Sequence, residues 1–261
     1  MKVVVPVKQV AALDDEFELL DDGSRVDPGS LEWELNEWDT FSLEAALQLR
    51  DTAGGDGEVV AITVGDEEAG EGLLSALAKG ADRAVRIWDE TLADADALAV
   101  ARVLAPAIAR ESPDLVLCGV QSSDAVNSAT GIALAGYLEM PHVAVVKGIE
   151  LDGRLATVER ELEGGLVELL RISLPALLTI QTGINEPRYA TLRAIKQARE
   201  KPLAIQSLGD VGLDATQVAA AAGSHRRRLA PPERGEGAEM LNGSTAEVAA
   251  RIAAIVKDRV G

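Results

Sequence analysis

Short apolar runs alternate along the first half of the chain with longer segments that have the apolar spacing of helices. The apolar runs cover residues 2–8, 58–64, 83–88 and 114–118. The helical patterns cover residues 36–51, 67–79, 94–111 and 128–138. Strands that are apolar on both faces and alternate with helices are typical of a parallel sheet with helices on both sides. The sequence therefore predicts a doubly wound, mostly parallel α/β fold over residues 1 to about 140.

The pattern changes after residue 140. Three runs at 143–150, 155–162 and 166–174 resemble antiparallel strands, because Asp152-Gly153 and Gly164-Gly165 form turn signals between them. A strand at 175–182, a basic and partly helical segment at 184–201 and a strand at 203–208 follow.

The last fifty residues lack the apolar material for a core of their own. They end in an amphipathic helix from Thr245 to Val260, with Ser244 or Thr245 as its cap. We therefore expect a core at 1–208 and, at 209–261, a C-terminal arm that wraps a partner or packs back.

Charge and cysteine content exclude several classes of protein. The formal net charge is -18, so a phosphate backbone would be repelled on average and nucleic-acid binding is disfavoured. Cys118 is the only cysteine and lies in an apolar run, which favours a buried structural thiol. No apolar stretch is long enough for a membrane span, and the N-terminal run is too short for a signal peptide. We expect a cytoplasmic protein.

The motifs of common enzymes are missing. There is no dinucleotide-binding glycine motif after the first strand, no phosphate-binding Walker loop and no zinc-protease motif. There are two histidines: His142 follows Pro141 at a loop–strand junction, and His225 lies in a basic tail. Neither position favours a catalytic or metal-binding role. The sequence thus favours a binder or carrier. In Rossmann-like and flavodoxin-like folds the ligand lies beyond the carboxyl ends of the strands, so the loops after Val7, Val64 and Cys118 are the candidate site.

Two polar segments occupy such positions. Asn36-Glu37-Trp38-Asp39 opens a helix, where the polar side chains either cap it or bind an adenosine moiety, with Trp38 covering a neighbouring ring. Residues 119–131 follow a buried strand and enter a helix, and they combine glycine, hydroxyls and amides. Free N–H groups at a helix start favour an anion, so this loop is a candidate phosphate site, although such loops are also common without one.

A third segment, residues 184–202, is basic within an acidic chain. It is either a solvated helix or a docking element in which Leu192 is an exposed apolar anchor.

Asn185-Glu186-Pro187-Arg188-Tyr189-Ala190-Thr191-Leu192 resembles the signature of electron transfer flavoprotein beta subunits. Further motifs of that family occur in the same order, from Val5-Pro6-Val7-Lys8-Gln9-Val10 through Pro113-Asp114-Leu115 and Leu174-Pro175-Ala176 to Pro231-Pro232.

The resemblance implies half of an alpha/beta heterodimer that carries electrons from flavin-dependent dehydrogenases to a membrane quinone oxidoreductase. The alpha subunit would hold most of the redox FAD. The beta subunit would bind a structural AMP, and its C-terminal arm would embrace alpha.

The resemblance also implies site residues. The AMP site would comprise Pro6, Asn36, Glu37, Trp38, Asp39, Val64, Ser122, Ser123, Asp124, Ala125, Val126, Asn127, Ser128, Ala129, Thr130, Gly131, Ile132 and Ala133. Trp38 takes the place of the family's aromatic residue near the flavin, and Leu13 a nearby place that is often Tyr. Partner docking would involve Arg188, Tyr189 and Leu192.

Two alternatives stay open. Electron-bifurcating relatives bind a second FAD where other members bind AMP, and such a beta subunit would take part in NADH oxidation. The retained Thr130-Gly131 and Asn185-Glu186-Pro187 resemble the AMP type more closely. The other alternative is a stand-alone adenine-nucleotide-binding module, which would not need the long segment after Gly209.

Overall fold

One nine-stranded sheet organises the chain. We describe it from a computed structural model, which covers residues 1–12, 18–20, 23, 26–27, 29, 31–227, 229–230 and 237–260. Leu13 and Pro231-Pro232 lie outside the described residues. The strands, in their order across the sheet, are β11 (Leu203–Gln206), β5 (Arg83–Ile87), β4 (Glu58–Val64), β1 (Lys2–Pro6), β6 (Leu115–Gly119), β10 (Ala176–Ile180), β7 (His142–Asp152), β8 (Leu155–Glu161) and β9 (Val167–Ser173).

The pairing confirms the predicted fold class. Every neighbouring pair from β11 to β7 is parallel, whereas β8 pairs antiparallel with both β7 and β9. The second half of the chain thus adds β10 and β7 to the parallel sheet and then extends the edge as an antiparallel meander. A short hairpin of β2 (Gln9–Ala12) and β3 (Glu32–Leu35) was not predicted, because only four residues form each strand.

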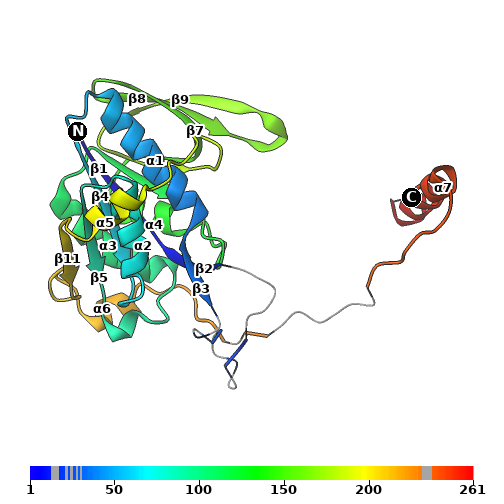
Figure 1. The fold of residues 1–261 in the computed structure, drawn as a ribbon, viewed down its shortest axis with the longest axis horizontal. Helices are drawn as coiled ribbons and strands as arrows, with labels where there is room; N and C mark the ends of the chain where they lie inside the picture. The colour runs from blue at the N-terminus through cyan, green and yellow to red at the C-terminus, as the bar shows by residue number, and fades with distance from the viewer. Residues whose placement is uncertain are drawn as a thin grey trace.

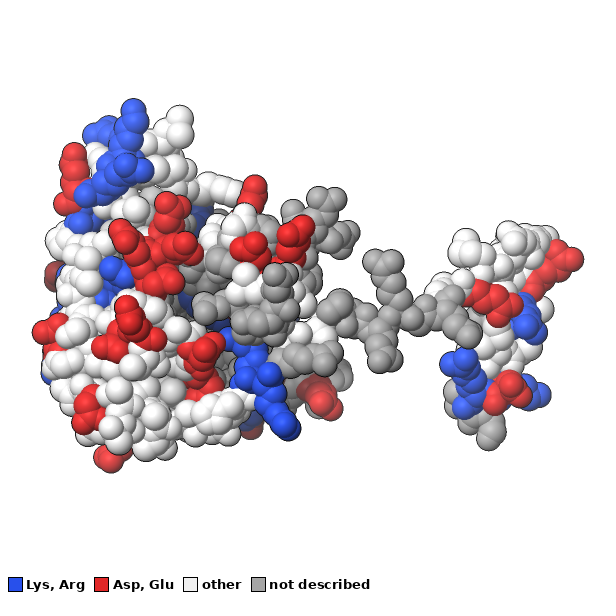
Figure 2. Space-filling model, turned by 90° about the horizontal axis from the view of Figure 1, so that it is seen from below, with Lys and Arg blue, Asp and Glu red and all other residues white. Residues whose placement is uncertain are grey.

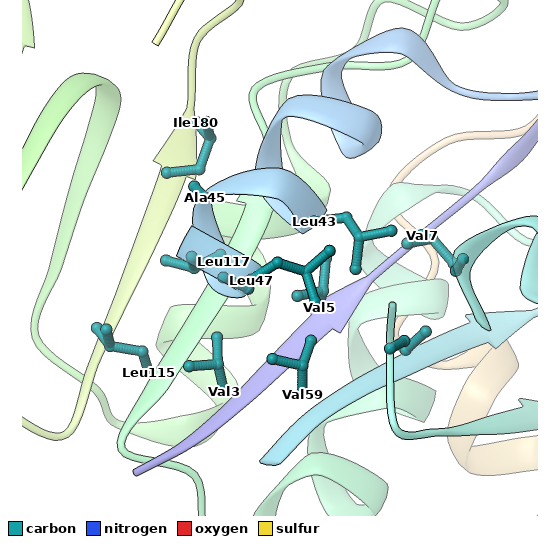
Figure 3. Close-up of a cluster of buried hydrophobic side chains, with 14 of the residues drawn as sticks. Val3, Val5, Val7, Leu43, Ala45, Leu47, Val59, Leu115, Leu117 and Ile180 are labelled. Atoms are coloured by element: carbon teal, nitrogen blue, oxygen red, sulfur yellow. The ribbon is translucent and has the colours of Figure 1, made fainter. Parts of the chain in front are cut away.

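Helices cover both faces of the sheet (Figure 1). α1 (Glu37–Thr52), α2 (Gly70–Lys79) and α5 (Leu192–Ala198) contribute buried residues to one apolar core, and α3 (Ala97–Glu111), α4 (Thr130–Leu138) and α6 (Ala215–Ala219) contribute to the other. Alternate residues of β1 enter opposite cores, as the strand geometry requires. Figure 3 shows the first core, where Leu43 and Leu47 of α1 lie over Val5 of β1 and Leu117 of β6.

The packed body continues beyond residue 208, where we expected the core to end. Val211, Leu213 and Val218 are buried in the core on the α3 side. Apolar residues spaced through a Gly- and Asp-rich stretch gave too weak a periodic signal to be assigned to the core.

The terminal helix α7 (Thr245–Val260) spans the predicted residues and stands clear of the body in Figure 1. Ser244 caps it: its hydroxyl and the Glu247 carboxylate form reciprocal bonds with each other's backbone N–H. The apolar side chains of Ile252 and Val256 are 49% and 54% exposed. An amphipathic stripe this exposed is unusual for a helix that packs on its own domain.

Acidic and basic side chains are distributed differently on the face of the body that Figure 2 draws. Figure 2 shows acidic side chains distributed across one face, with Lys and Arg gathered in a few places. Among the described residues, no helix is both long enough and apolar enough to span a bilayer.

Candidate functional site

The sheet reverses its order at β1. The strands β4 and β5 lie on one side of β1, and the chain then crosses back through α3 to place β6 on the other side. Loops that leave β1 and β6 therefore diverge to opposite faces of the sheet and open a crevice between them.

A cavity of about 210 Å³ lies at this point. Its wall comes from the ends of β1, β4 and β6, the start of α3 and the loop that leads into α4. The three loops expected to form a site are thus brought together. The predicted cofactor-binding residues on the wall are Pro6, Asn36, Asp39, Val64, Ser122, Ala125, Asn127, Ser128, Ala129, Thr130 and Gly131. The others are not among the lining residues: Glu37, Trp38, Ser123, Asp124, Val126, Ile132 and Ala133.

The segment 120–129, which we term the cavity loop, presents backbone donors. Val126 and Ser128 adopt positive φ values of 52° and 50°, a left-handed conformation that redirects successive N–H groups. Ala129 precedes α4 and makes no capping hydrogen bond through its side chain. The first N–H groups of a helix have no partner within the helix, so this start can receive an anion.

Gly131 lets α4 approach the sheet closely. A Cβ atom at this position would lie 2.8 Å from Cγ2 of Thr179 on β10 and 3.3 Å from Cβ of Cys118 on β6. Any side chain here would push the helix start away from the strands, so the glycine sets the depth of the cavity.

The start of α1 holds the cavity loop in place. The Asn36 side-chain amide donates to the Gln121 carbonyl over 2.9 Å, and its oxygen accepts from the Ser123 N–H over 3.2 Å. Asn36 makes no capping hydrogen bond through its side chain, so the capping interpretation was wrong for this residue. Its polar groups are used to cross-link two loops, which a linear sequence does not reveal.

Asp39 joins the two strands that flank the crevice. Its buried carboxylate accepts from the N–H of Lys8 over 2.8 Å and from the N–H of Gly119 over 3.2 Å. Burial raises the pKa of this carboxyl to about 7, and the bonds from Lys8, Asn36 and Gly119 oppose the rise. Gly119 is needed for this approach, because a Cβ atom would lie 2.4 Å from Asp39 Oδ1.

Trp38 faces a different neighbour. Its indole N–H donates to Gln181 Oε1, just after β10, over 3.1 Å. The ring is half-buried and does not line the cavity. It is therefore positioned at the end of the strand next to β6, not against the wall where a nucleotide in the cavity would lie.

Sequence reasoning missed Lys8 and Asp96 as cavity residues. The Lys8 ammonium lies 2.7 Å from the Asp124 carboxylate and 3.3 Å from the Ser122 hydroxyl. Burial raises the pKa of Asp124, but the bonds from Lys8 and Ser122 outweigh it and hold that pKa below its usual value. A lysine directly after the first strand was the available signal.

Asp96 has a structural part in the wall. It caps α3 by accepting from the Leu98 and Ala99 N–H groups, and its other oxygen accepts from Gly223 and Ser224. The chain after α6 is thereby tied to the cavity rim.

The segment 185–191, which we term the docking loop, precedes α5, contacts α1 and does not line the cavity. Tyr189 is 96% exposed and Leu192, the first residue of α5, is 82% exposed. Arg188 instead turns inward, where its guanidinium contacts Glu44 and Asp51 of α1. The structure thus exposes two of the three predicted docking residues.

The family comparisons agree with these features. A model of the electron transfer flavoprotein domain matches residues 26–210, and the chain is 47% identical over the full length of both chains to an electron transfer flavoprotein subunit beta of Methylophilus methylotrophus. The chain belongs to the family of electron transfer flavoprotein beta subunits. It is also 36% identical to the human beta subunit, covering 83% of this chain and 85% of that one. A subunit of the caffeyl-CoA reductase–Etf complex of Acetobacterium woodii is 36% identical over 86% of each chain.

The family match covers both loops but ends before α7. Both the cavity loop and the docking loop lie within residues 26–210, whereas the Methylophilus beta subunit matches along the whole chain. Members of this family are electron carriers rather than enzymes, which agrees with the lack of a recognised catalytic motif in the sequence.

Cys118 is confirmed as a buried thiol. Burial, aided by the nearby Asp39 charge, raises its pKa well above the usual range. The thiolate form is thereby suppressed, so this residue is a packing element of the cavity floor.

Proposed function

We propose that this chain is the beta half of an electron-carrying heterodimer and binds AMP in the cavity at the β1–β6 switch point. The observation that carries the proposal is the convergence of an uncapped helix start and the left-handed residue Ser128 on one wall of that cavity. Backbone donors of this kind suit a phosphate.

The residues present fit a mononucleotide. Ser128, Ala129, Thr130 and Gly131 would supply donors for the phosphate, while Val64 and the apolar residues Val100 and Leu104 of α3 would contact the remainder. Lys8 adds a cation at the rim. Such a nucleotide is structural, since Asp39 and Asp96, the carboxyl groups on the cavity wall, are both engaged by backbone N–H groups of this chain.

The redox chemistry of the heterodimer comes from FAD, which an alpha subunit would mainly hold. This chain binds that subunit, orients it and presents a docking surface to flavin-dependent dehydrogenases and to a quinone oxidoreductase. The exposed stripe of α7 supports an alpha partner, because a helix with Ile252 and Val256 half exposed gains stability by packing on another surface.

Cofactor content tests the proposal. The chain is co-expressed with its alpha subunit, the heterodimer is purified, and nucleotides are extracted and separated. We expect one FAD and one AMP for each heterodimer. Extraction of FAD without AMP, at one FAD for each heterodimer, would contradict the AMP site.

Two FAD and no AMP would instead support the bifurcating alternative. The flavin titration distinguishes the two directly. A chain that purifies alone as a stable, nucleotide-loaded monomer would favour the stand-alone module.

The docking role is tested at Leu192. We expect Leu192→Ala to raise the KM for the heterodimer in dehydrogenase-driven reduction while FAD content stays unchanged. Ile205→Ala is the matched control, because Ile205 is an apolar side chain of similar exposure on the edge strand β11. Equal kinetics for Leu192→Ala and wild type would contradict the role.

A further inference from the structure

The docking loop is fastened to α1 and α2 by a set of partly buried polar contacts. Glu44 lies in the middle of α1 with its carboxylate buried. It accepts from Arg188 Nε over 2.7 Å, from Arg188 Nη2 over 3.0 Å and from the Arg188 backbone N–H over 3.2 Å. A carboxylate that receives three donors from one residue determines the position of both its side chain and its backbone.

Contacts of Lys79 and Asn185 also hold the docking loop against α1 and α2. Lys79, at the end of α2, donates to the Arg188 carbonyl over 2.9 Å and lies 6.0 Å from the centre of the Tyr189 ring. The Asn185 side chain donates to the Phe41 carbonyl over 3.0 Å. Arg188 is therefore held at both its backbone N–H and its carbonyl. The exposed side chains of Tyr189 and Leu192 follow within four residues.

We propose that Glu44 is a positioning residue for partner docking: by clamping Arg188 it holds the docking loop in the one arrangement that exposes Tyr189 and Leu192. This inference rests on the proposed docking role of Leu192. The docking loop is thereby preorganised for its partner. Preorganisation raises affinity because less conformational freedom is lost when the partner binds.

The basic residues of the segment 184–202 fall into an engaged group and an exposed group. Arg188 and Lys201 are engaged within the chain, since Lys201 donates to the carbonyls of Leu77 and Ala81 at the end of α2. Arg193, Lys196 and Arg199 are exposed. Arg188 thus acts inward, and its contribution depends on its forked geometry rather than on its charge alone.

The experiment compares four variants of the purified heterodimer. Glu44→Gln keeps the shape of the side chain and leaves no buried charge behind. Arg188→Lys keeps the positive charge but loses the fork that contacts both carboxylate oxygens. Arg193→Gln removes one exposed charge from α5 without touching the clamp. Leu192→Ala removes the anchor itself.

Reduction is driven by a flavin-dependent dehydrogenase that reduces the wild-type heterodimer in the presence of the dehydrogenase's own substrate. We expect Glu44→Gln and Arg188→Lys to raise the KM for the heterodimer about tenfold with little change in kcat, as loss of preorganised binding predicts. FAD content should stay unchanged, and amide hydrogen exchange should speed up at residues 186–191. Arg193→Gln should change the KM less.

A double-variant cycle separates positioning from plain stabilisation. If Glu44 acts through the anchor, Glu44→Gln raises the KM by a smaller factor in a Leu192→Ala background than in the wild type, the remainder coming from Tyr189. Additive effects in the double variant would overturn the inference, as would a normal KM for Glu44→Gln when Leu192→Ala raises it. A normal KM for Leu192→Ala would overturn the docking role itself, and with it the need for a clamp.

Discussion

Two loops that follow neighbouring strands of one sheet have opposite designs. The cavity loop follows β6 and the docking loop follows β10, and the two strands pair in parallel. Both loops are fastened at α1: Asn36, just before the helix, holds the cavity loop, and Glu44 further along holds the docking loop. Asp39 binds Gly119 at the end of β6, directly before the cavity loop. The cavity loop leads into a helix start whose backbone donors face the cavity. The docking loop turns Asn185 and Arg188 inward and leaves Tyr189, and Leu192 at the start of α5, in solvent.

The comparison shows how one helix can serve two kinds of binding. Polar residues of α1 do not themselves need to touch a ligand, because each already has its partners in a loop. They decide instead which groups of the loop stay free. At the cavity loop, hydrogen-bond donors stay free to bind a ligand. At the docking loop, apolar side chains stay exposed to bind a partner. Changes to the cavity side should therefore leave docking intact, and the four predictions that follow test that separation.

The largest effect is expected at Gly131. Gly131→Ala places a Cβ atom 2.8 Å from Thr179 and should cost about 2 kcal/mol of unfolding free energy, as overpacking does. Bound nucleotide should also fall. Gly136→Ala is the matched control on the same helix, because its Cβ atom meets nothing within 4 Å. It should stabilise α4 by about 0.5–1 kcal/mol. Urea denaturation measures both, and equal effects would contradict the close approach.

A pH dependence is expected from Asp39. Its folded-state pKa is raised from 3.8 to about 7, so the folded protein binds a proton that the unfolded chain has already released. Stability must therefore fall as pH rises between these two values, by about 2 kcal/mol from about pH 5 to pH 7. Unfolding free energies of wild type and Asp39→Asn, measured across this range, give the contribution by difference. Parallel pH profiles of the two proteins would show that Asp39 ionises normally.

Removal of the loop cross-link should have a moderate effect. Asn36→Ala leaves the Gln121 carbonyl and the Ser123 N–H without their partner, at a cost of about 1.5 kcal/mol because both groups can still reach some water. The cavity loop should exchange its amide hydrogens faster, while the docking loop should not. Faster exchange in both loops would mean that α1 transmits the change and the two sites are not separate.

The smallest effect is expected at Ser123. Its hydroxyl oxygen is buried without a hydrogen-bond partner among the described residues, and Ser123 does not line the cavity. Ser123→Ala should change the unfolding free energy by less than about 0.5 kcal/mol and leave nucleotide content unchanged. Loss of AMP in this variant would place the hydroxyl in the binding site and extend the cavity loop's role to that residue.

The sequence predicted the fold class and most element positions because apolar periodicity reports burial directly. Strands with two buried faces, such as 58–64, and helices with one, such as 245–260, follow from that pattern. It also located the carboxyl-end loops, since parallel strands bring those ends together. The β2–β3 hairpin and the packing of Val211 to Val218 were missed, because short or irregular segments carry too few residues for a period to show.

Individual roles within the site needed the tertiary structure. The sequence by itself determined that this is a doubly wound family member with polar loops at one edge of its sheet, because local pattern and spacing are enough for that. Only the fold decided that Asn36 joins loops and does not cap, that Lys8 reaches the cavity, and that Arg188 turns inward to Glu44. Asn36 and Arg188 have their side-chain partners at least 85 residues away along the chain. The partner of a polar side chain at that separation is set by the packing of the elements, which no local pattern records.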